Sequence, residues 1–144
     1  IRDRLYNTER FDVRGKELLR LRPKYYVVDM AFKQLLLPDI NRDRGHVLEN
    51  VVYLELRRRG YTVYVGQLTK GEIDFVAQKP GGILEYYQVS ESVLDPTTRD
   101  RELAPLEAVN DQYPKFLLTM DELYKPHNYN GIQQYNVLDW LLGM

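Results

Sequence analysis

Apolar residues recur at helical spacing between Asp43 and Gly60, and this is the clearest pattern in the chain. The spacing predicts a helix there, with Asn41 or Asp43 as its N-cap and Gly60 as its C-terminal cap. The expected core of the protein, about residues 43–120, begins with this helix.

Segments with β-type alternation follow the helix, at 61–65 (YTVYV), 72–78 (EIDFVAQ) and 83–89 (ILEYYQV). Helical spacing returns over 96–110, where Pro96 suits the first turn and Pro105 is expected to kink or split the helix. Residues 115–119 (KFLLT) complete the series as a further strand. The core order is therefore helix, strand, strand, strand, helix, strand.

This order predicts an α/β fold, a mixed sheet flanked by helices. Consecutive strands joined by short connections are expected to be antiparallel neighbours, whereas the helix before the last strand makes a crossover that favours parallel pairing. Within the second strand the alternation places Ile73, Phe75 and Ala77 on one face, with Asp74 on the other.

The flanking segments carry weaker signals. Residues 1–22 are dense in charge and read as a hairpin arm that ends a preceding region, with Pro23 as a boundary. Residues 24–29 (KYYVVD) predict a short strand, and 30–37 predict a helical turn or two. The tail, 131–144, predicts a short strand followed by a helical turn.

Composition narrows the classes of protein. The 144 residues suit one domain, and 44% apolar against 28% charged residues are typical of a globular chain. The net charge of −1 gives no global basic field, so DNA binding would need a local patch. The chain contains no cysteine, no apolar run of membrane-spanning length and no signal peptide. Because it starts at Ile1, we expect a piece of a larger cytoplasmic protein.

The residues with catalytic potential are Glu49 on the first core helix, Asp74 on the second strand, and Gln88 and Ser90 on the third. Side chains two apart on a strand share a face, so Gln88 and Ser90 point together, and a neighbouring strand can bring Asp74 beside them. A metal-dependent phosphodiesterase needs such an arrangement, in which carboxylates hold Mg²⁺ and the metal activates a water.

The order and spacing of these residues resemble the PD-(D/E)XK nuclease superfamily. That resemblance implies an acid on the first helix, an Asp on the second strand and a Glu-x-Lys on the third. More narrowly, the chain resembles the C-terminal domain, of unknown function, of a prokaryotic AAA+-type ATPase family. The runs that carry this resemblance are Lys24-Tyr25-Tyr26 through Asp29, Gly45-His46-Val47-Leu48-Glu49-Asn50 and Gly71-Glu72-Ile73-Asp74-Phe75.

The resemblance covers roughly residues 10–143. Members of the family are similar in carrying an ATPase module, a winged-helix segment and then this domain. It implies a restriction-endonuclease-like core, with 1–22 as the tail of the winged-helix-like region and 23–144 as the nuclease-like domain. The chain has no phosphate-binding loop sequence, so an ATP site is expected only in the attached module.

The chain departs from the nuclease pattern in its third strand. Gln88 occupies the position of the acid, and Ser90 occupies the position of the lysine. Serine brings no positive charge to the transition state, and losing one such contact costs on the order of a hundredfold in rate. Lys70 and Lys115 are candidate replacements, although nothing in the sequence places either beside Asp74. We therefore expect a degraded catalytic site.

Simpler interpretations stay open for each residue. Glu49 is also an ordinary solvated helix carboxylate, and Asp74 is equally suited to a solvent face of its strand. Three candidates for nucleic-acid contacts are Arg57, Arg58 and Arg59. They are weak candidates, because the negative end of the helix dipole favours cations at this position without any ligand. The two histidines show no metal-ligand spacing.

The leading hypothesis is a non-catalytic, nuclease-fold accessory domain of an ATP-binding AAA+-type ATPase that recognises nucleic acid or a protein. One alternative is a Mg²⁺-dependent DNA endonuclease, with Asp74 and Glu49 as metal ligands and Gln88 as a weak third. Another is a pure protein-interaction domain that uses its tyrosine-rich strands and sheet edges. The expected partners are DNA and the covalently linked ATPase module, with no membrane.

Overall fold

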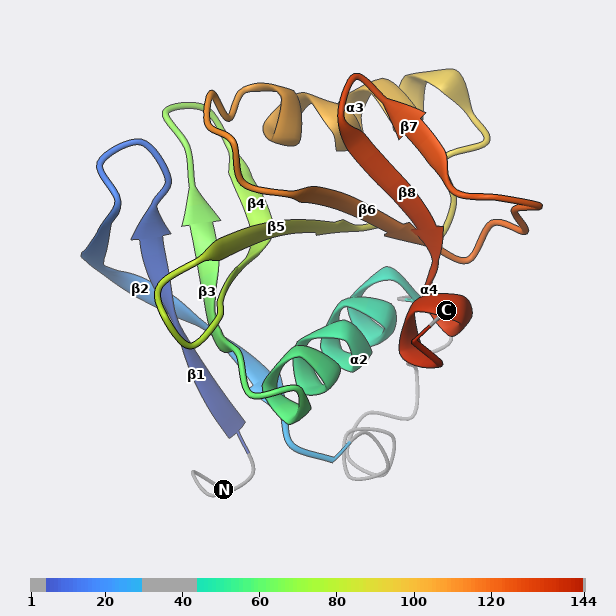
Figure 1. Cartoon of the computed structure of the whole chain (residues 1–144). Coiled ribbons are helices and arrows are strands. Elements are labelled where there is room, and N and C mark those ends of the chain that lie inside the picture. Colours follow the sequence, from blue (N-terminus) through green and yellow to red (C-terminus); the bar gives the residue numbers. More distant parts are fainter. Residues whose placement is uncertain (1–4, 30–43, 144) are drawn as a thin grey trace.

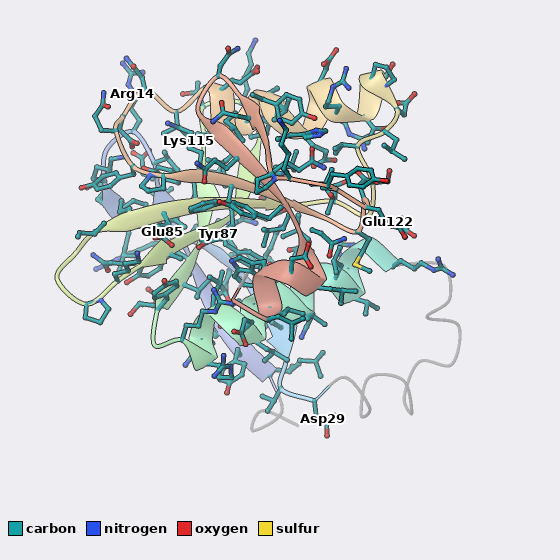
Figure 2. The ribbon with its side chains drawn as sticks, turned by 45° about the vertical axis from the view of Figure 1, so that its right-hand side comes forward. Arg14, Asp29, Glu85, Tyr87, Lys115 and Glu122 are labelled. Atoms are coloured by element: carbon teal, nitrogen blue, oxygen red, sulfur yellow. The ribbon has the colours of Figure 1, made fainter. Side chains whose placement is uncertain are left out.

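The computed structural model describes residues 5–29 and 44–143 and shows a mixed α/β protein. One sheet has the strand order β2-β1-β3-β4-β5-β6-β8-β7 (Figure 1). The strands are β1 (Leu5–Asp12), β2 (Glu17–Val27), β3 (Thr62–Gln67), β4 (Glu72–Gln78), β5 (Leu84–Val89), β6 (Lys115–Thr119), β7 (His127–Tyr129) and β8 (Ile132–Asn136), and the helices are α2 (Arg44–Arg58), α3 (Pro96–Glu107) and α4 (Val137–Leu141).

The predicted core order is confirmed as α2, β3, β4, β5, α3, β6. Strands β3, β4 and β5 pair antiparallel in sequence order, and β6 pairs parallel to β5 after the α3 crossover. The sheet is larger than predicted, because the N-terminal hairpin and the C-terminal strands extend it at both ends.

Helix α2 ends as its sequence predicts. Gly60 adopts a φ of 86°, in the left-handed region that glycine reaches without steric cost. The Tyr61 N–H then donates to the Leu56 carbonyl at 3.1 Å, which satisfies a carbonyl at the helix end. This cap directs the chain straight into β3. The candidate N-caps Asn41 and Asp43 lie outside the described residues.

Helix α3 begins with Pro96 after the N-cap Asp95, whose carboxylate accepts from the Thr98 N–H at 2.8 Å. Of the two outcomes expected at Pro105, the split is wrong, since α3 runs through this residue without a break, and the kink stays a prediction. Pro105 lies in the last turn, where the lost N–H leaves only the Arg101 carbonyl without its usual helical donor.

The N-terminal residues form the predicted hairpin, β1 and β2, and β1 also pairs parallel to β3. The prediction of a separate short strand over 24–29 is wrong, because β2 runs through Pro23 without a break and ends at Val27. Pro23 lies in an irregular stretch of an edge strand, where no sheet partner needs its missing N–H. The assignment of 1–22 to a preceding region stays a prediction, and the helical turn expected over 30–37 lies outside the described residues.

Helices cover both faces of the sheet (Figure 1). On one face, Leu103 and Leu106 of α3 share a buried cluster with Val76. On the other face, Tyr53 of α2 and Trp140 of α4 belong to a second cluster. The sheet therefore separates two hydrophobic layers, and the candidate residues lie where its strands pass between them.

The predicted tail strand and helical turn are confirmed as β8 and α4, and Asn136 caps α4 by accepting from the Leu138 N–H at 2.8 Å. Strand β8 pairs parallel to β6. The short strand β7 was not predicted, because its three residues carry no apolar alternation.

Candidate functional site

A bulge in β4 determines the direction of the Asp74 side chain. Tyr64 pairs with Val76 and Gly66 pairs with Ile73, so Asp74 and Phe75 together face one residue of β3. A bulge of this kind reverses the alternation. The prediction that Ile73, Phe75 and Ala77 share a face is therefore wrong: Ile73 belongs to the cluster on the α3 face, and the other two belong to the α2 face.

Strands β4 and β5 separate next to this bulge. Their last paired residues are Phe75 and Tyr87. Beyond that pair, the Asp74 N–H donates to the Gln88 side-chain oxygen at 3.2 Å, and the Val89 N–H donates to the Asp74 carboxylate at 2.9 Å. Asp74 and Gln88 thus lie together as predicted, and each satisfies a backbone group of the opposite strand.

Glu49 approaches the same region from α2. The Tyr26 hydroxyl donates to its carboxylate at 2.5 Å, and the Lys24 ammonium lies 3.9 Å from it. The His46 imidazole lies 3.7 Å from the second carboxylate oxygen. The Glu49 side chain is only 13% exposed, so the interpretation as an ordinary solvated carboxylate is wrong.

Lys24 is a functional candidate that the sequence analysis missed. Its ammonium forms an ion pair with Glu72, which also pairs with Arg10 at 2.7 Å. Lys24 and Tyr26 are two apart on β2 and therefore point to the same face, toward α2. The spacing of Lys24 and Tyr26 is visible in the sequence. The packing that brings Lys24 of β2 to Glu72 of β4 is not.

Glu102 joins the group from the other face of the sheet. The Gln88 amide nitrogen donates to its carboxylate at 3.0 Å. Helix α3 provides this residue on the turn that precedes the buried Leu103. The Gln88 side chain therefore links β4, β5 and α3. A glutamate at this position could not fill the same structural role, because Glu102 would repel it.

The carboxyl group of Asp74 favours its protonated form. Its buried surroundings, followed by the negative charge of Glu49, raise its pKa well above the ordinary value, although the Val89 hydrogen bond and the charge of Lys24 act in the opposite direction. Burial and then Glu49 likewise raise the pKa of Tyr26, which remains a hydrogen-bond donor. Glu72 behaves differently: burial opposes ionisation, but its bonds to Lys24 and Arg10 lower its pKa overall.

Neither predicted replacement for the nuclease lysine lies in this group. Lys115 donates to the Asp111 carbonyl at 3.2 Å, and Lys70 lines a pocket between two turns. Ser90 donates its hydroxyl to the Ser92 carbonyl at 3.2 Å, so it caps the end of its own strand. Of the described cations, Lys24 is the one that contacts Glu49.

The arginines at the end of α2 are engaged within the chain. Arg58 and Arg59 both donate to the Glu55 carboxylate at 2.7 Å. The guanidinium groups of Arg59 and Arg57 also lie over the rings of Trp140 and Tyr6, at 4.2 and 4.3 Å. Contacts to nucleic acid through these residues would compete with those interactions.

The chain is similar to an uncharacterized protein of Haemophilus influenzae. The two are 37% identical over 137 residues, which make up 95% of this chain and 33% of that protein. The chain thus spans about a third of the length of the curated relative it matches. No family model matches the chain, and no solved structure matches it.

Over residues 5–29 and 44–143, no group of three or more His, Cys, Asp or Glu side chains is arranged to hold a metal ion. Over the same ranges, no helix has the length and apolar character that crossing a bilayer requires. The candidate site is a set of polar side chains, Glu49, Asp74, Gln88 and Glu102. These side chains form hydrogen bonds with other groups of the chain.

The raised pKa of Asp74 predicts how stability depends on pH. The folded state holds a proton on this group at pH values where the unfolded state has lost it, so stability falls as pH rises from the ordinary carboxyl pKa toward the raised one. Asp74→Asn keeps an acceptor for Val89 and removes the titration. We expect the free energy of unfolding of this variant to exceed that of the wild type by about 1 kcal/mol or more at pH 9. At pH 4 we expect no such gain.

Urea unfolding between pH 4 and 9 measures this difference. Asp100→Asn is the matched control, because Asp100 is exposed on α3 and the substitution should leave the pH profile unchanged. A wild type and an Asp74→Asn variant with parallel pH profiles would contradict a protonated Asp74.

Proposed function

We propose that this chain is a non-catalytic accessory domain with a restriction-endonuclease-like core, part of an AAA+-type ATPase, which recognises nucleic acid or another protein. The carrying observation is the ion pair of Lys24 with Glu72, beside Glu49 at 3.9 Å. The nuclease resemblance implies a metal ion held by acids at positions such as Glu49, and here an ammonium group of the chain supplies positive charge beside that residue.

The fold is consistent with this proposal. A helix, three antiparallel strands, a crossover helix and a parallel strand follow each other in the order that the nuclease resemblance implies. Glu49 and Asp74 converge next to the separation of β4 and β5, and Gln88 bridges it. The greater length of the Haemophilus influenzae relative supports a domain within a larger protein.

The state of the candidate residues favours a recognition role over cleavage. Burial and the charge of Glu49 raise the pKa of Asp74, Gln88 is uncharged, and Ser90 bonds to its own loop. A hydrolytic centre for phosphodiesters needs ionised ligands for a hard cation and a cation for the developing charge. Glu49 and Glu72 lie beside the Lys24 ammonium, which competes with a metal ion for their carboxylates.

One observation favours the alternative, a Mg²⁺-dependent DNA endonuclease. Lys24 provides a cation 3.9 Å from Glu49, and Glu102 adds a carboxylate beside Gln88. In that enzyme Lys24 would stabilise the transition state, so Lys24→Met would abolish cleavage.

Calorimetric titration of Mg²⁺ and Mn²⁺ into the protein tests the proposal, together with cleavage assays on linear and branched DNA. We expect no saturable heat at millimolar metal and no cleavage products. Metal binding that disappears in Asp74→Ala, with cleavage that disappears in Lys24→Met, would overturn the non-catalytic role and establish the endonuclease.

A further inference from the structure

A pocket of about 640 Å³ lies at one end of the sheet, away from the Asp74 group. Three segments form it: the β1–β2 turn, the β3–β4 turn and the chain that follows α3, which Figure 1 shows close together at upper left. The lining residues are Val13, Arg14, Lys16, Leu68, Thr69, Lys70, Ala108, Val109, Asn110 and Asp111.

The pocket is basic although the chain as a whole is not. Arg14, Lys16 and Lys70 contribute three positive charges, against one carboxylate, Asp111, among the lining residues. The whole chain carries a net charge of −1. Cations from separate turns therefore converge on one cavity, which is the local patch that an anionic ligand requires.

Asp111 does not oppose an anion in this pocket, because its charge is already compensated. The Lys16 ammonium donates to it at 2.7 Å, the Tyr86 hydroxyl at 2.5 Å and the Tyr113 N–H at 3.0 Å. Burial alone would raise the pKa of Asp111, but the bonds from Lys16 and Tyr86 outweigh it and lower the pKa.

Lys16 has several partners in this arrangement. Its backbone adopts a φ of 56°, in the left-handed region that non-glycine residues seldom occupy, and its ammonium lies 5.4 Å from the centre of the Tyr86 ring. Strained backbone of this kind persists where the surroundings fix it and is concentrated at functional sites. The turn that carries Arg14 is therefore preorganised.

The side chains of Arg14 and Lys70 keep uncompensated charge. Both residues are exposed, and over residues 5–29 and 44–143 neither side chain forms an ion pair with the chain. A phosphomonoester carries about −1.5 to −2 charges at neutral pH, which two cations match, and the Arg14 guanidinium can bind phosphate oxygens in bidentate fashion.

Most of the remaining lining is apolar, and Thr69 and Asn110 are its uncharged polar residues. Val13, Leu68, Ala108 and Val109 line the pocket beside the cations. Ligand pockets of roughly 300–1,000 Å³ that combine an apolar surface with a few polar groups suit a small molecule with a ring and a charged end. We propose that this pocket binds a nucleoside phosphate, either a free nucleotide or the phosphorylated end of a nucleic-acid strand.

This inference rests on the proposed recognition role and names its ligand. Titration calorimetry with AMP, adenosine and inorganic phosphate tests the free nucleotide, and fluorescence anisotropy with a short single-stranded oligonucleotide, with and without a 5′-phosphate, tests the strand. We expect Arg14→Ala combined with Lys70→Ala to weaken binding roughly tenfold or more. Arg20→Ala, an exposed arginine outside the pocket, is the matched control and should change binding less than twofold.

Tighter binding of AMP than of inorganic phosphate or adenosine, lost in the double variant, assigns the pocket to free nucleotides. Binding of the phosphorylated strand alone assigns it to strand ends. Absence of binding to every probe, or equal binding by the wild type and the double variant, overturns the inference. A chain that cleaves DNA through Asp74 would overturn the proposed function instead, so the two failures are distinguishable.

Discussion

Replacing Tyr53 with alanine should lower the free energy of unfolding by about 3–5 kcal/mol, the range that large-to-small changes at buried aromatic residues produce. Tyr53 has no exposed surface and lies at the centre of an aromatic group beneath the sheet. Its ring centroid is 4.3 Å from that of Tyr26, 5.8 Å from Phe75 and 5.7 Å from Tyr6. No neighbouring element can fill the cavity without moving β2 or β4.

The control is Tyr53→Phe, which keeps the ring and removes a hydroxyl whose recorded contact is 3.4 Å to Arg57. We expect that change to cost less than about 1 kcal/mol. Urea unfolding followed by circular dichroism measures both variants. A loss below about 1 kcal/mol for Tyr53→Ala would show that this aromatic group does not hold α2 against the sheet.

Gly66→Ala should destabilise the protein by about 1–3 kcal/mol, although it adds a single methyl group. A Cβ at this position would lie 2.9 Å from a Val76 methyl, 3.0 Å from the Ile73 Cβ and 3.2 Å from a Val13 methyl. These neighbours are buried, two of them on β4 and one directly after β1, so they have little room to move. Because Gly66 pairs with Ile73 next to the bulge, the substitution should also shift Asp74.

Gly45→Ala provides the matched control, since a Cβ there meets no atom of the described residues within 4 Å and the residue lies in the first turn of α2. Alanine in place of glycine in a helix is neutral or stabilising by up to about 1 kcal/mol. The thermal unfolding midpoint should therefore fall in Gly66→Ala, whereas in Gly45→Ala it should stay the same or rise. Equal midpoints for Gly66→Ala and the wild type would show that β3 and β4 can separate to accept the methyl group.

The sequence predicted the core elements because each has a strong local period. The segments 72–78 and 115–119 coincide with β4 and β6, and Gly60 marks the end of α2 through its backbone conformation. Local signals of this kind depend on neighbours within a few residues, so no knowledge of the sheet is required.

The features that the sequence did not predict depend on pairing between distant segments. The bulge at Asp74 exists because Gly66 of β3 pairs with Ile73, and nothing in EIDFVAQ indicates the reversal of its alternation. Lys24 reaches Glu49 through the packing of β2 against α2, and Glu102 reaches Gln88 across the sheet from α3. Site geometry was therefore less predictable than the elements that carry it.

The position of β1 leaves one of its two edges without a partner strand during part of synthesis. Strand β1 leaves the ribosome before its partner β3, which pairs with it through residues as far apart as Arg10 and Val65. Until β3 emerges, the hairpin of β1 and β2 presents an open strand edge that can pair with other chains. Parallel pairing over such a separation is also slow to form. A chaperone that covers this edge until β3 emerges would prevent such pairing.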